Sequence, residues 1–152
     1  MKSQQITTGI GGSVVVLALV VAIFSPASRA SAHTKWVSNA NHACAVEKAE
    51  FAAVPHYTGT RASLLSALQK LTAIRVKLVA TLKRVDAAPS DRKLVTGLYH
   101  YFALDIAELR HVIVEVRTGS TTPMATLLRK VNGYETSEAV LLRALDNNCG
   151  QV

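Results

Sequence analysis

The two cysteines constrain the fold of this chain more than any other feature. Cys44 and Cys149 are the only cysteines among 152 residues, and nearly all residues able to build a folded core lie between them. A disulfide would close a loop of roughly 100 residues, which chain-entropy arguments value at about 4.7 kcal/mol. The alternatives are a metal-binding pair and two free thiols, and two thiols alone supply only half of a zinc site. We favour the disulfide, because the upstream segment indicates export to an oxidising compartment.

The first 32 residues have the features of an export segment. Lys2 is the only charged side chain before Arg29, a dense apolar run covers 14–24, and the small residues at 30–32 are typical of a cleavage site. The dense run is shorter than the roughly 17–25 residues of a membrane span, whereas the diluted run over 6–24 is long enough for an anchor. We therefore expect residues 1–32 to be a signal peptide or signal anchor. Residues 33–150 form the exported domain, which is either secreted or anchored to the outer face of the cytoplasmic membrane.

Prolines divide the rest of the chain into four segments with apolar periodicity. Each proline lacks the N–H that a helix interior needs, so helices are predicted over 41–54, 61–86, 91–117 and 123–147. The short turns between the last three helices favour antiparallel neighbours. The sequence predicts an all-α, up-and-down four-helix bundle. Its short first helix is expected to cover only the half of the bundle near the cysteines and to leave a groove in the other half.

Polar residues stand at two positions where the helical periodicity predicts apolar ones. Arg75 interrupts the stripe of the second helix and Asp105 that of the third. Folding the helices about their turns places Arg75 opposite Tyr101 and one turn from Asp105. The same folding places Asp105 near Glu135 and Glu138. This mid-bundle layer is a structural ion pair that fixes the register of the helices, a set of side chains that reach solvent at the edge of the stripe, or a ligand-binding site.

A basic face is predicted on the second helix. Lys70, Lys77 and Arg84 recur every seven residues, and no acidic residue occurs between 51 and 85. Residues 33–152 carry 15 basic and 10 acidic residues, because the leader holds Lys2 and Arg29 and no acid. This face is either an ordinary solvated surface or a contact for an anionic lipid or polymer. Helix 61–86 has no aromatic side chains among its basic residues, which argues against binding of single-stranded nucleic acid.

The sequence contains no recognisable catalytic motif and predicts no cofactor. Glu108 and His111 have the Glu-x-x-His spacing of di-iron bundles, but such bundles need two of these motifs and this chain has one. No metal site is therefore predicted. The aromatic cluster at 99–102 would suit a bound ligand, although aromatic residues at helical spacing more often pack in a core.

Four short motifs carry a resemblance to known proteins. They are Trp-Val-Ser-Asn-Ala-Asn-His-Ala-Cys at 36–44, Asp-Ala-Ala-Pro at 86–89, Arg-Thr-Gly-Ser at 117–120 and Asn-Cys-Gly at 148–150. With them the chain resembles a group of small exported helical-bundle proteins of actinobacteria, over most of residues 33–150. The resemblance implies an exported or anchored four-helix domain with paired terminal cysteines. It implies no catalytic residue.

The function expected from these features is non-enzymatic. We expect an interaction or structural module of the cell envelope, which binds an unknown protein or an anionic envelope component. Nucleic acid is not an expected partner, and membrane contact would be made through the N-terminal segment. The alternative is a carrier of a small ligand or metal that uses the mid-bundle polar and aromatic residues.

Overall fold

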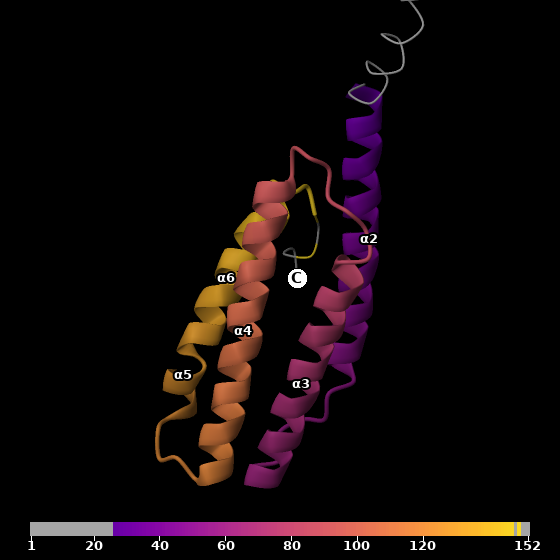
Figure 1. The fold of residues 1–152 in the computed structure, drawn as a ribbon. Helices are drawn as coiled ribbons and strands as arrows, with labels where there is room; N and C mark the ends of the chain where they lie inside the picture. Colours follow the sequence, from indigo (N-terminus) through magenta and orange to yellow (C-terminus); the bar gives the residue numbers. More distant parts are fainter. Residues whose placement is uncertain (1–25, 148, 150–152) are drawn as a thin grey trace, which may run out of the picture.

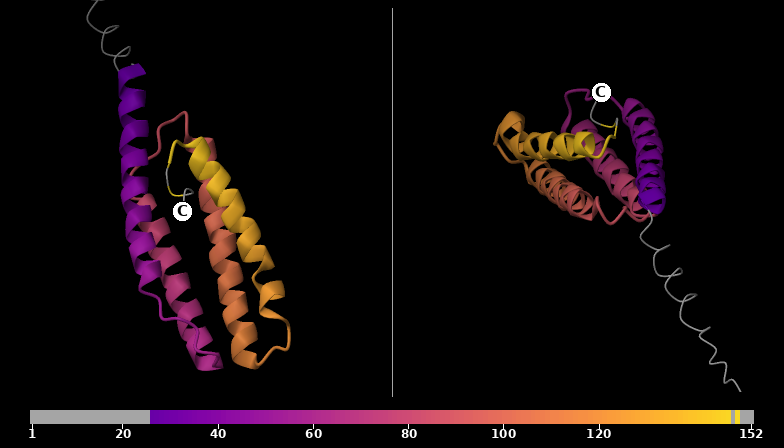
Figure 2. Two further views of the ribbon diagram at one scale, coloured as in Figure 1. Left: turned by 180° about the vertical axis from the view of Figure 1, so that it is seen from behind. Right: turned by 90° about the horizontal axis from the view of Figure 1, so that it is seen from above.

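The computed structural model of the chain describes residues 26–147 and 149, which fold into a helical bundle (Figure 1). Four long helices, α2 (Pro26–Ala52), α3 (Arg61–Leu82), α4 (Arg92–Thr118) and α6 (Arg129–Ala144), are accompanied by the single turn α5 (Met124–Leu127). Helix α3 packs against α2 and α4, and α4 packs against α6. Consecutive long helices run in opposite directions (Figure 2). The prediction of an all-helical chain with four long helices is confirmed.

The first helix is long, so the prediction that it is short and begins at residue 41 is wrong. Helix α2 has 27 residues, as many as α4, and it continues through residues 32 and 33, where we placed the end of the leader. Pro26 is its first residue, a position at which the missing N–H of proline costs nothing. Trp36, Ala40 and Ala43 are buried at helical spacing, and this burial holds the added turns on the bundle. The dense apolar run at 14–24 lies outside the described residues.

The first turns of α2 extend beyond the bundle. Figure 1 shows its N-terminal part rising past the ends of α3, α4 and α6. At the opposite end α2 stops at Ala52, and none of its residues belongs to the apolar cluster formed there by α3, α4 and α6. The expectation that the first helix covers only the cysteine half of the bundle therefore holds, even though its predicted start was wrong.

The core consists of two apolar clusters. The cluster near the cysteines is built around Trp36, Leu82, Leu98 and Phe102, with residues from all four long helices. The other cluster contains Leu68, Leu109, Val112, Ile113, Val116 and Val131. Along α3 and α4 the two clusters are separated by the positions of Arg75 and Asp105. The polar residues singled out in the sequence therefore lie where the two clusters meet.

Local signals explain several helix ends. The hydroxyl of Thr60 accepts a hydrogen bond from the N–H of Ser63 at 3.1 Å, as a capping residue does, and α3 begins at the next residue. Gly119 has φ +81° and ends α4, with the N–H of Ser120 bonded to the carbonyl of Glu115 at 2.9 Å. The predicted single helix over 123–147 is interrupted at Leu128, which separates α5 from α6. The predicted end at Gly150 lies outside the described residues.

The segment after α6 turns back so that Cys149 lies against α2. Asp146 has φ +55°, a left-handed conformation that turns the chain after α6. The side-chain oxygen of the buried Asn147 then accepts a hydrogen bond from the N–H of Cys149 at 2.8 Å. This turn brings Cys149 to Cys44, with their Cα atoms 5.5 Å apart, and the two form a disulfide.

Candidate functional site

Arg75 of α3 is the centre of an ion cluster in the middle of the bundle. Its Nη1 donates a hydrogen bond to Glu47 Oε1 at 3.0 Å, and its Nη2 donates one to Glu135 Oε1 at 2.7 Å. Arg75 Nε lies 3.4 Å from Asp105 Oδ2, and Nη1 lies 3.7 Å from Glu138 Oε2. One guanidinium therefore holds four carboxylates, which come from α2, α4 and α6. We call these five residues the Arg75 cluster.

Four of the five residues of the cluster were predicted from the sequence. Glu47 was missed, and the predicted Tyr101 does not belong to the cluster. The structure brings together Arg75, Asp105, Glu135 and Glu138. Glu47 was not placed with them, because the linker between the first two helices does not fix their register. Tyr101 is half-buried and its ring contacts His100 instead. The guanidinium carbon of Arg75 lies 5.4 Å from the ring centroid of Phe51 and 6.0 Å from that of Phe102.

Burial differs sharply among the four carboxylates. Asp105 is 0% exposed and Glu138 is 2% exposed. The side chain of Glu135 is 46% exposed, so it stands at the rim of the cluster, and that of Glu47 is nearly buried. Asp105 and Glu138 have therefore lost their hydration and depend on hydrogen bonds and ion pairs within the protein. Charged groups are rarely buried so completely without full pairing.

The protein offers these two carboxylates fewer hydrogen bonds than they can accept. Both carboxylate oxygens of Asp105 lack a hydrogen-bond partner, and so does Oε1 of Glu138. Burial raises the pKa of Glu138 to about 8, although the charge of Arg75 acts in the opposite direction. Burial likewise raises the pKa of Asp105 to about 6 and moves the pKa of Glu47 upward. The buried side of the cluster therefore favours protonated carboxyl groups.

Arg75 itself stays charged. Burial acts to lower its pKa, but the carboxylates of Glu47, Glu138 and Asp105 and the hydrogen bond to Glu135 raise it, and the net direction is upward. The cluster therefore has a fixed positive charge at its centre. Its negative charge varies with the protonation of the surrounding carboxyl groups.

A small cavity opens beside the cluster. Its volume is about 100 Å³, and Glu47, Arg75, Glu135 and Glu138 supply its polar wall. The apolar wall consists of Leu78, Phe102, Ala139, Leu142 and the disulfide-bonded Cys149. The cavity lies in the half of the bundle that α2 covers. The groove predicted from the sequence lies in the opposite half.

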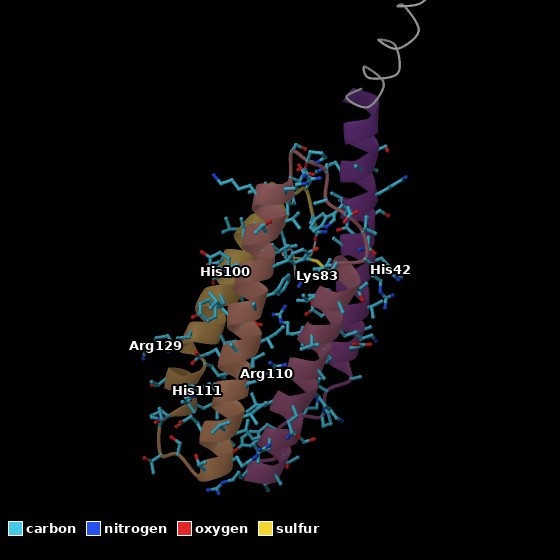
Figure 3. The ribbon with its side chains drawn as sticks, viewed as in Figure 1. His42, Lys83, His100, Arg110, His111 and Arg129 are labelled. Carbon is cyan, nitrogen blue, oxygen red and sulfur yellow. A yellow bond between two sulfur atoms is a disulfide. The ribbon has the colours of Figure 1, made fainter. Side chains whose placement is uncertain are left out.

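The three residues of the predicted basic face have different surroundings. Lys77 forms an ion pair with Glu50 of α2, which neutralises part of the face. Lys77 and Arg84 line a second cavity of about 270 Å³ between α2 and α3, together with His42, which lies at the outer edge of α2 (Figure 3). Lys70 is exposed farther along α3 and does not line this cavity.

His33 lies close to residues at the ends of two other helices. It lies in α2, and its Nδ1 is 2.7 Å from Asp91 Oδ2 at the start of α4. Its Nε2 is 3.8 Å from Asp146 Oδ2, just after α6. A polar residue before a helix start has no partner that the sequence can identify, and only the longer α2 brings His33 to these carboxylates.

The Glu-x-x-His pair of α4 is split between two environments. Glu108 is half-buried and lies 3.7 Å from Lys130, whereas His111 is exposed on α4, as is His100 (Figure 3). Across the described residues, no group of three or more histidine, cysteine, aspartate or glutamate side chains is arranged to hold a metal ion. The same part of the chain contains no helix that is both long and apolar enough to cross a membrane.

Comparisons with known proteins give no match. No protein family matches the chain, and neither does any curated protein or solved structure.

Proposed function

We propose that the chain is a non-enzymatic interaction or structural module of the cell envelope, exported by its N-terminal segment. The observation that carries this proposal is the bridge between Cys44 and Cys149, which joins the first long helix to the end of the chain. Disulfides persist in oxidising compartments and are rare in the cytosol. The apolar leader before α2 supports the same location.

The proposed partner is an anionic envelope component or a protein with an acidic surface. It would contact the cavity between α2 and α3, where Lys77 and Arg84 lie, and extend along α3 to Lys70. The net positive charge of the chain supports an anionic partner. The ion pair of Lys77 with Glu50 leaves Arg84 and Lys70 as the cations available to it.

The location is tested by fractionating cells that express the full chain and by labelling its thiols without reduction. We expect the protein in the envelope or the medium, with no thiol available to alkylation until a reductant is added. A variant with both cysteines replaced by serine controls for non-specific labelling. Free thiols on a protein recovered from the cytosol would overturn the proposal.

The partner surface is tested with vesicles rich in phosphatidylglycerol. A triple variant with Lys70→Glu, Lys77→Glu and Arg84→Glu should lose most of the vesicle binding of the wild-type protein. A matched triple variant, Arg110→Glu, Arg117→Glu and Arg129→Glu, changes the net charge equally at exposed positions elsewhere and should bind better than the first. Equal losses in both variants would show that net charge alone determines binding.

A further inference from the structure

The Arg75 cluster contains more negative than positive groups. Four carboxylates surround one guanidinium, and Lys77 of the same helix is paired with Glu50 outside the cluster. Arg75 can neutralise one of these charges. A buried site with a surplus of carboxylates needs protons or a second cation, because unpaired charges are costly to bury.

The donors of Arg75 do not satisfy all of the carboxylate oxygens. The hydrogen bonds of Arg75 go to Glu47 and Glu135, the two more exposed carboxylates. Glu138 is 2% exposed, its Oε2 is 3.7 Å from Arg75, and its Oε1 has no hydrogen-bond partner. Glu138 is therefore a buried acceptor with an open position.

Glu138 lines the cavity of about 100 Å³ beside the cluster. Glu47 from α2 and Glu135 from α6 line the same space, so three glutamates face one small volume. The opposite wall is apolar and includes Leu78, Ala139 and Leu142. The cavity thus combines several hydrogen-bond acceptors with room for a few carbon atoms.

We propose that this cavity binds a small primary ammonium ion, with its N–H groups directed at Glu47, Glu135 and Glu138 and its short alkyl group against the apolar wall. An ammonium group has three donors, which matches three carboxylates that each have acceptor capacity left. An anion would meet three carboxylates. A metal ion would have to displace Arg75, and the described residues offer no metal-ligand arrangement. This inference goes beyond the envelope module and does not depend on where the protein is located.

Binding is coupled to a proton. Glu138 faces Glu47 from α2, Arg75 from α3, Asp105 from α4 and Glu135 from its own helix, and burial raises its pKa to about 8. The ammonium ion needs the ionised carboxylate, so below that pH it must displace the proton of Glu138. Affinity is therefore expected to increase as the pH rises through about 8, while the ligand amine stays protonated until about pH 10.

The test uses the oxidised protein as isolated, with ethylammonium chloride as the probe. We expect saturable one-to-one binding by calorimetry and a rise in melting temperature. Tetramethylammonium chloride at equal ionic strength has the same charge but no N–H donor and should have neither effect. Sodium acetate tests the opposite ligand charge and should also have no effect.

Two variants locate the site. Glu138→Gln keeps the size of the side chain and removes the charge, and it should weaken ethylammonium binding by roughly ten-fold or more and abolish the pH dependence near pH 8. Glu135→Gln, at the exposed rim, should weaken binding without a risk to folding. Glu108→Gln is the control, because Glu108 pairs with Lys130 and does not line the cavity.

The possible results separate clearly. Absence of ethylammonium binding would overturn the inference and leave the Arg75 cluster as a structural network. Equal binding of tetramethylammonium, or binding unaffected by Glu138→Gln, would also overturn it. Binding of acetate in place of ethylammonium would show that the cavity accepts an anion through Arg75. None of these outcomes affects the vesicle or thiol tests of the envelope module.

Discussion

At the scale of single residues, Arg75 stabilises a layer whose four carboxylates would otherwise repel one another. Its guanidinium contacts carboxylates from three other helices, and the rings of Phe51 and Phe102 lie near it. Buried ion pairs add little net stability compared with apolar residues of similar size. Removing one partner is strongly destabilising, because it leaves the other charges buried without compensation.

We therefore predict that Arg75→Leu lowers the free energy of unfolding by about 3–5 kcal/mol near neutral pH. The loss should shrink in acid, because protonated carboxyl groups no longer need the guanidinium. Urea denaturation of the wild-type protein and Arg75→Leu, at neutral and at acidic pH, measures the loss of stability. Lys70→Leu, at an exposed position of the same helix, should change stability by no more than about 0.5 kcal/mol. A loss in Arg75→Leu that is the same at both pH values would contradict this account.

The raised pKa of Glu138 also predicts a pH dependence of stability. Its folded pKa of about 8 lies above the ordinary 4.5, so the folded state binds this proton more tightly than the unfolded state. The stabilisation is fully present below pH 4.5 and is lost as the pH rises through about 8. Asp105 acts in the same direction between pH 3.8 and about 6.

The measurement compares the wild-type protein with Glu138→Gln, whose neutral amide does not titrate. Between about pH 5 and about pH 9 the wild-type protein should lose a few kcal/mol of stability relative to the variant. Glu108→Gln should follow the wild-type curve. Parallel curves for wild type and Glu138→Gln would mean that Glu138 titrates normally.

At the scale of elements, α2 shows how tertiary burial sets a helix start. Residues 26–40 contain several small and polar side chains and little apolar periodicity, so the sequence gives them only a weak tendency to form a core-facing helix. Trp36 is 0% exposed in the apolar cluster near the cysteines, and Ala40 and Ala43 follow it on the same face. The small alanines let α2 approach its neighbours closely, and Trp36 fills the end of the bundle.

Trp36→Ala should therefore destabilise the protein by about 3–5 kcal/mol, the usual cost of removing a buried large aromatic side chain. The N-terminal part of α2 should also become less protected from amide hydrogen exchange than the part after Cys44. Tyr57→Ala is the control, because Tyr57 is exposed in the linker before α3 and should have little effect. A small effect of Trp36→Ala would mean that the bundle does not depend on the early turns of α2.

At the scale of the whole molecule, the bundle is a series of helices closed by one covalent bond. Helix α2 packs on α3, α3 on α4 and α4 on α6, and the disulfide ties α2 to the segment after α6. The contact of His33 with Asp91 also links α2 to the start of α4. Loss of the disulfide would leave the first and last elements held together only by packing and weaker polar contacts.

Reduction should lower the free energy of unfolding by about 2–5 kcal/mol, since the bridge closes a long loop. The double variant Cys44→Ala and Cys149→Ala should show the same loss, and a reductant should have no further effect on it. Denaturation with and without reductant measures both. If reduction left the unfolding midpoint of the wild-type protein unchanged, the bridge would not contribute to stability.

The sequence alone determined the helical class, the approximate extent of α3 and α4, and the grouping of Arg75 with Asp105, Glu135 and Glu138. These properties depend on the spacing of apolar residues and on prolines and glycines close by in the chain, and short turns fixed the register of Arg75 against Asp105, Glu135 and Glu138. Only the tertiary structure decided where α2 begins, that Glu47 joins the cluster, and that a cavity lies beside Glu138. The physical reason is that these features depend on contacts of α2 with distant parts of the chain, and no local pattern specifies them.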